Sequence, residues 1–61
     1  MTIVFKKFEY GNVWSELYME KDFRVPLWRY GYKRNGVEVV VKSKLFSKPN
    51  LKKISERYRN M

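Results

Sequence analysis

Apolar and polar residues alternate along two stretches of the chain, and the pair Asn35-Gly36 lies between them. Alternation with a period of two residues is typical of β-strands that bury one face. Asn-Gly between two such stretches is the strongest short signal for a type I′ turn, because both central residues need positive φ. The pattern therefore predicts a β-hairpin with strands at residues 23–33 and 37–46.

A two-residue turn also predicts which residues of the two strands face each other. Counted outward from the turn, the expected pairs are Arg34–Val37, Lys33–Glu38, Tyr32–Val39, Gly31–Val40, Tyr30–Val41, Arg29–Lys42 and Trp28–Ser43. Opposed residues share a face of the sheet, and successive residues alternate between faces. One face is therefore expected to carry Trp28, Tyr30, Tyr32, Val39 and Val41. The other face is expected to carry Glu38 and four cations, Arg29, Lys33, Lys42 and Lys44.

The segments before the hairpin predict further strands. Residues 2–8 are rich in β-branched and aromatic side chains, which favours a first strand, and Gly11-Asn12 predicts a turn. Residues 13–20 fit either a strand or a helix. Their Val, Trp and Tyr residues, and the marginal stability of an isolated hairpin, favour a third strand beside it.

The C-terminal segment, residues 47–60, predicts an amphipathic helix. Ser47 or Asn50 can cap its N-terminus, and Pro49 suits the first turn. A helical apolar stripe follows at Leu51, Ile54, Tyr58 and Met61. The expected fold is a single α+β domain over residues 1–61, in which the aromatic face of a three- to four-stranded antiparallel sheet packs on this helix.

The composition narrows the available chemistry. The 61 residues include no cysteine and no histidine, which removes the commonest general base, the thiolate nucleophile and zinc-finger ligands. We therefore expect no enzymatic activity, no cofactor and no metal. The sequence also contains no apolar stretch long enough for a membrane span and no secretory signal pattern, so an intracellular, cytoplasmic protein is expected.

The charge distribution points to a polyanionic partner. The net charge is +8, and residues 1–23 hold four acidic and three basic residues. Residues 24–61 hold eleven basic and two acidic residues. Such an excess is typical of nucleic-acid binding and less often of an anionic membrane. Many small basic proteins carry it without such a partner.

The cationic sheet face is the predicted nucleic-acid-binding site, and duplex DNA ranks ahead of RNA. A two-stranded ribbon fits the major groove of B-DNA, which is about 12 Å wide. Arg29 is the candidate for a base edge, since a guanidinium can bind guanine bidentately. The other candidates, for phosphate contacts, are Lys33, Arg34, Lys42, Lys44, Lys48, Lys52 and Lys53. Alternatively, these lysines protect an exposed sheet from aggregation.

A protein-binding function is the second hypothesis. If residues 13–20 turn Trp14 and Tyr18 outward, these rings form an exposed patch beside Glu16 and Glu20. A small phage-type inhibitor or adaptor could then bind a host protein, with Trp14, Tyr18 and Trp28 as anchors. Trp28, Tyr30 and Tyr32 could also stack on bases, but a small domain needs that face for its core.

The run Trp28-Arg29-Tyr30-Gly31-Tyr32-Lys33-Arg34-Asn35-Gly36, its return strand and the helix at 47–60 resemble the arm-type DNA-binding domain of tyrosine integrases. Those domains, related to the plant AP2 fold, lay a three-stranded sheet in the major groove and back it with a C-terminal helix. The resemblance covers the second half of the chain and implies an accessory or regulatory DNA binder. Residues 1–23 are longer and more acidic than the family pattern, and no integrase catalytic domain follows in this sequence.

Overall fold

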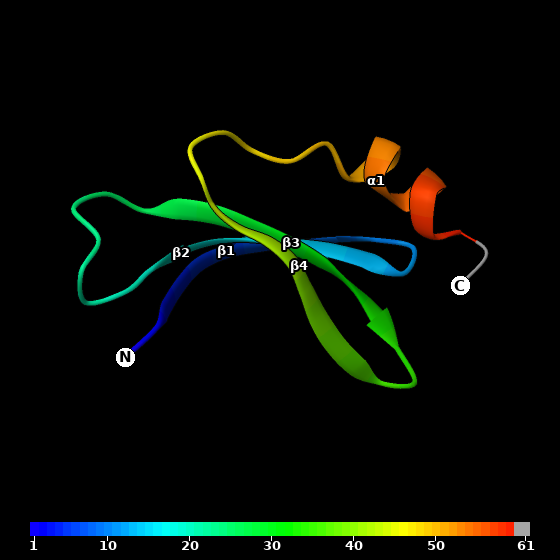
Figure 1. Ribbon diagram of the computed structural model, residues 1–61, viewed down its shortest axis with the longest axis horizontal. Coiled ribbons are helices and arrows are strands. Elements are labelled where there is room, and N and C mark those ends of the chain that lie inside the picture. Colours follow the sequence, from blue (N-terminus) through cyan, green and yellow to red (C-terminus); the bar gives the residue numbers. More distant parts are fainter. Residues whose placement is uncertain (60–61) are drawn as a thin grey trace.

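The computed structural model describes residues 1–59 and has four antiparallel strands and one helix (Figure 1). The elements are β1 (Ile3–Tyr10), β2 (Val13–Met19), β3 (Leu27–Arg34), β4 (Val37–Leu45) and α1 (Leu51–Tyr58). Each strand pairs with the next along the chain, in the order β1-β2-β3-β4. The predicted small α+β fold is confirmed, and residues 13–19 form a strand rather than a helix.

The hairpin between β3 and β4 follows the prediction at its turn. Asn35 and Gly36 have φ values of 52° and 78°, as a type I′ turn requires. The four pairs nearest the turn also match the expected register, and they are Arg34–Val37, Lys33–Glu38, Tyr32–Val39 and Gly31–Val40.

Beyond Gly31 the predicted register is wrong. Tyr30 pairs with Lys42 instead of Val41, and Trp28 pairs with Leu45 instead of Ser43, so Arg29 does not face Lys42. Two irregularities in β4 cause these shifts, and bulges of this kind bend a strand and increase its twist. Lys44 lies in this region with a left-handed φ of 58°, and its backbone N–H donates to the Tyr18 hydroxyl.

The bend in β4 begins beside Gly31 of β3, where the backbones of the two strands come unusually close. An ideal Cβ atom at Gly31 would overlap the carbonyl oxygen of Val39 and lie 2.7 Å from its carbonyl carbon. Only glycine permits this approach of two backbones. In Figure 1, the turn end of the β3–β4 hairpin bends away from β1 and β2 on the side opposite α1.

Coiling of the sheet encloses the face opposite the helix, which we call the coiled face. Trp14 and Tyr18 are each only 2% exposed, and both alternate onto this face together with Glu16. The Trp14 indole N–H donates to the Tyr32 carbonyl at 3.3 Å, and the Lys7 ammonium lies 5.5 Å from the indole centre. The most buried aromatic side chains therefore lie on the face opposite the one that the sequence predicts to form the core.

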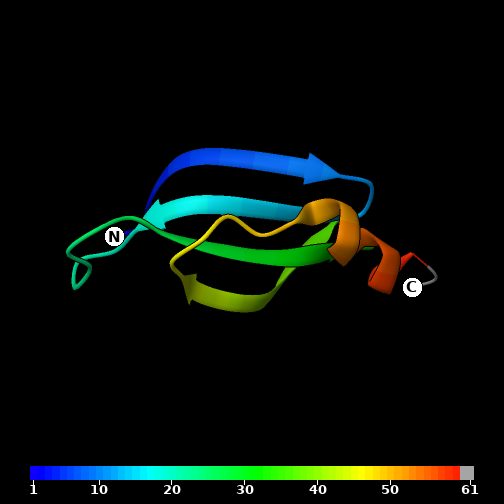
Figure 2. The same ribbon diagram turned by 90° about the horizontal axis from the view of Figure 1, so that it is seen from above.

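The helix α1 covers the other face at the end that holds the β1–β2 turn (Figure 2). Asn50 is its N-cap, with its side-chain oxygen accepting from the Lys53 N–H, so the second of the two predicted caps is confirmed. Ile54 is buried, and the Tyr58 ring stacks on Tyr32 with centroids 5.2 Å apart. The helix is shorter than predicted because it begins after this cap. Met61 of the predicted stripe lies outside the described residues.

Candidate nucleic-acid interface

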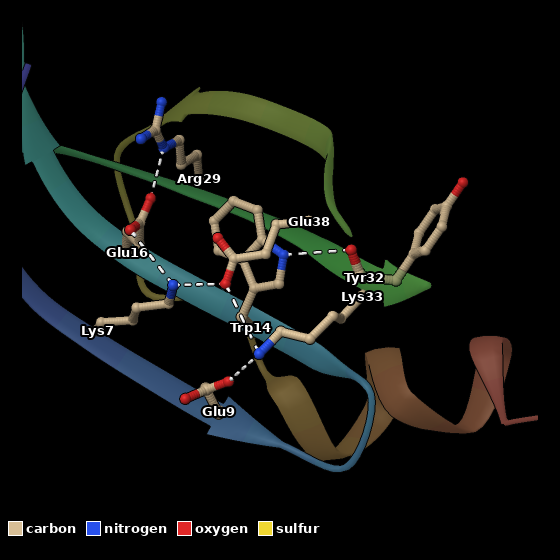
Figure 3. Close-up of polar contacts among 8 residues, drawn as sticks. All are labelled: Lys7, Glu9, Trp14, Glu16, Arg29, Tyr32, Lys33 and Glu38. Atoms are coloured by element: carbon tan, nitrogen blue, oxygen red, sulfur yellow. Dashed lines mark hydrogen bonds and ion pairs between the residues drawn. The ribbon is translucent and has the colours of Figure 1, made fainter. Parts of the chain in front are cut away.

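The predicted cationic face is crossed by a network of ion pairs (Figure 3). Glu16, 7% exposed, lies opposite Arg29 in the register of β2 and β3 and accepts from its Nε at 2.8 Å. The Arg29 guanidinium carbon lies 4.4 Å from the centre of the Tyr18 ring. Lys7 Nζ approaches the second Glu16 oxygen at 3.9 Å. Arg29 is therefore held by a carboxylate and an aromatic ring of the same molecule.

The network continues to both edges of the sheet. Lys7 of β1 donates to Glu38 of β4 at 2.6 Å, although about 14 Å, or three inter-strand spacings, would separate these strands in a flat sheet. Lys33 donates to Glu9 at 3.0 Å and lies 3.9 Å from Glu38. These contacts join all four strands on the coiled face and include three cations and three carboxylates, so the network is formally neutral.

This arrangement corrects the predicted basic patch. Arg29 and Lys33 lie on the expected face but pair with carboxylates there. Lys42 faces Tyr30, so it lies on the helix side, and Lys44 occupies the irregular part of β4. The four cations predicted to share one face therefore do not form one patch. The continuous cationic surface expected from a regular ribbon is therefore not present on this sheet face.

The missed partners came from the N-terminal third of the chain. Glu9 and Glu16 lie in residues 1–23, apart in sequence from the cations of the hairpin, whereas in the fold β2 lies beside β3 and β1 lies next to β2. One signal was available in the sequence, since glycine inside a strand often marks a bulge or a close backbone approach. Gly31 is such a residue.

The ion pairs shift two pKa values in opposite directions. The pKa of Glu9 is lowered from its ordinary 4.5, chiefly because its carboxylate accepts a hydrogen bond from Lys33 and lies near that positive charge. The pKa of Lys7 is raised from 10.5, chiefly by its hydrogen bond to Glu38. Both groups are therefore stabilised in their charged forms.

The lowered pKa of Glu9 predicts a loss of stability in acid. A carboxyl whose pKa is lower in the folded state stabilises the fold above its ordinary pKa, and this contribution disappears as the pH falls through the folded-state pKa. Thermal melting followed by circular dichroism should show a smaller difference between about pH 6 and about pH 3 for Glu9→Gln than for the natural chain. Glu20→Gln is the control, because Glu20 has no ion-pair partner within residues 1–59. An equal pH response in all three proteins would contradict the assignment.

Two of the three predicted protein-binding anchors, Trp14 and Tyr18, are not on the surface. Trp14 and Tyr18 are buried on the coiled face, so an exposed aromatic patch beside Glu16 does not form. Trp28 is half-buried on the helix side and packs against Phe8 with ring centroids 6.1 Å apart. The physical reason is again the curvature of the sheet, which turns the outward face of β2 into an interior.

The unbalanced positive charge lies mainly on the helix side. At the β2–β3 loop, Lys21 and Arg24 are accompanied by Glu20 and Asp22. Outside that loop and the ion-pair network, Glu56 is the remaining acidic residue. The other cations are all exposed, and five of them lie on α1 and its flanking residues: Lys6, Arg34, Lys42, Lys44, Lys48, Lys52, Lys53, Arg57 and Arg59. These exposed cations account for the net charge of +8.

A hollow of about 330 Å³ lies between β3 and the helix on this cationic side. Tyr30, Phe46 and Ile54 contribute apolar or aromatic walls, and Lys53 and Arg57 line it from the helix. Lys48 also lines it, and its ammonium lies 4.0 Å from the centre of the Phe8 ring, which is not part of this hollow. Cationic and aromatic side chains thus converge on one concave site.

Comparisons of the chain with protein-family models, with curated proteins and with solved structures found no match. Within residues 1–59, no helix is long and apolar enough to cross a membrane, and no three acidic side chains are grouped as a metal site. The fully buried Ser15 hydroxyl has no hydrogen-bond partner in this part of the chain. Its burial separates it from any substrate.

Proposed function

We propose that this protein is a non-enzymatic nucleic-acid-binding protein with an accessory or regulatory role. Its contact surface, the helix-side cationic surface, is formed by α1 and the segment before it and includes Lys48, Lys52, Lys53, Arg57 and Arg59. The observation that supports the proposal is the separation of charges. The cations of the coiled sheet face are paired within the molecule, whereas those around the helix are exposed and accompanied by one acid, Glu56.

The expected contacts are with phosphate groups. Lysine and arginine side chains that neutralise phosphates release counterions, which supplies most of the free energy of sequence-independent binding. Arg29, the candidate for reading a base edge, has its Nε committed to Glu16. We therefore propose recognition of the phosphate backbone, with duplex DNA as the first ligand to test. An intracellular location follows from this proposal.

Removal of two helix charges should weaken binding and its salt dependence. Fluorescence anisotropy with a short labelled duplex should give a slope of log K against log salt of about −4 to −5 for four to six contacts. Lys52→Gln with Lys53→Gln should reduce the magnitude of that slope by about 2 and lower the affinity at least roughly tenfold. Glutamine keeps a good helix propensity, so α1 should persist.

The matched control is Lys21→Gln with Arg24→Gln. It changes the net charge by the same amount, but at the β2–β3 loop, which lies at the opposite end of the molecule from α1 (Figure 1). This control should bind the duplex almost as tightly as the natural chain. Equal losses in both double variants would mean that only the net charge matters. Binding that does not respond to salt would contradict the proposal as a whole.

A further inference from the structure

Phe46 is exposed to an unusual degree for a large aromatic side chain. It is 87% exposed, the highest value among the large hydrophobic residues of the described range 1–59 after Met1, and it lies in the connection between β4 and α1. Its neighbours in the sequence include Lys44 and Lys48, and it lines the 330 Å³ hollow together with Tyr30. Burial in the core therefore does not account for this ring.

The walls of the hollow combine the two features that single-stranded nucleic acid requires. Aromatic rings offer flat surfaces on which bases of any sequence can stack, and nearby cations bind the phosphates. Tyr30 and Phe46 supply the rings. Lys53 and Arg57 are four residues apart on α1, so their side chains lie on one face about 6 Å apart at the Cβ atoms. Two such cations can contact neighbouring phosphates of one strand.

We infer that this hollow, the Phe46 hollow, binds an unpaired base of single-stranded DNA or RNA. The base stacks on Phe46 or Tyr30, while Lys53, Arg57 and Lys48 contact the adjoining phosphates. Its volume is at the small end of the range for ligand sites, about 300–1,000 Å³, which suits one base rather than a base pair. In a duplex, base faces are covered by neighbouring bases, whereas an unpaired base exposes them. This inference rests on the proposed function and specifies its preferred ligand.

The test compares Phe46→Ala with Phe5→Ala against three labelled ligands, oligo(dT), oligo(rU) and a duplex, at one salt concentration. Phe5 is also exposed, at 52%, but does not line the hollow, so it is a matched control for loss of a surface phenyl ring. Phe46→Ala should weaken binding of a single strand roughly tenfold and change duplex binding less than about twofold. Phe5→Ala should change neither single-strand binding nor duplex binding. Melting curves of both variants check that they fold.

The outcomes separate this inference from the proposed function. If Phe46→Ala binds both single strands as tightly as the natural chain, the stacking site is wrong, and duplex binding lost in the Lys52/Lys53 double variant would still support the proposed function. If no nucleic acid binds at low salt, the stacking site and the proposed function are both contradicted. A response of either oligonucleotide supports the inference, and the stronger response identifies DNA or RNA as the source of the base. In an NMR titration with the natural chain, the signals of Tyr30, Phe46 and Ile54 should shift first, and unchanged signals at all three would overturn the site.

Discussion

Replacement of Gly31 by alanine should destabilise the fold by about 3 kcal/mol or more. The added methyl group would overlap the Val39 carbonyl oxygen, which belongs to backbone and cannot move aside as a flexible side chain can. To relieve this overlap, β4 would have to separate from β3 where the sheet bends. At about 0.05–0.15 kcal/mol per residue, a chain of this size has roughly 3–9 kcal/mol of stability, and an overpacking penalty of about 3 kcal/mol or more removes much of it.

The control for this prediction is Gly36→Ala. A Cβ atom at Gly36 meets no other atom within 4 Å, so its cost comes from the positive φ of 78° and should be about 1–2 kcal/mol. Urea titrations monitored by circular dichroism would compare the two variants. If Gly31→Ala is as stable as Gly36→Ala, the close approach of the β4 backbone to Gly31 is incorrect.

Loss of the Trp14 ring should be nearly as damaging. The side chain is 2% exposed, donates to the Tyr32 carbonyl and lies under the Lys7 ammonium. Truncation of a buried Trp to Ala costs about 3–5 kcal/mol, which is comparable to the whole stability expected for this chain. The free energy of unfolding of Trp14→Ala, measured in urea, should therefore be lower than that of the natural chain by about 3–5 kcal/mol.

The same substitution at Trp28 is the matched control. Trp28 is half-buried, so Trp28→Ala should remain folded and lose clearly less free energy of unfolding than Trp14→Ala. A Trp14 variant as stable as the Trp28 variant would show that the coiled face is not the core. Because Trp14→Ala loses a large part of its stability, loss of a binding partner in that variant would not by itself identify a contact.

Several features could be predicted from local sequence because their causes are local. Asn35 and Gly36 adopt positive φ at little cost, so the turn and the first four pairs of the hairpin follow from two residues. Asn50 caps the helix because its side chain reaches the free N–H of Lys53, three residues further along. The alternation in residues 37–40 likewise assigns Val39 to the helix side, opposite Tyr32.

The candidate site was predicted less well, because it depends on contacts between distant segments. The sequence predicts Lys48, Lys52 and Lys53 as phosphate contacts, and all three lie in the proposed surface. It does not single out Arg57 and Phe46, since their relation to Tyr30 appears only in the hollow that they share. The pairing of Arg29 could not be predicted either, because its partner, Glu16, lies thirteen residues away on the neighbouring strand.

The sequence by itself determined the Asn35-Gly36 turn, the two strands that flank it, the C-terminal helix and the total charge of +8, because each depends on neighbouring residues or on composition. Only the tertiary structure decided which cations remain unpaired and which rings are buried. The bend of β4 at Gly31 brings Glu38 to Lys7 and closes one face over Trp14. Side-chain charge is a property of each residue, whereas its neutralisation depends on where the backbone brings the opposite charge.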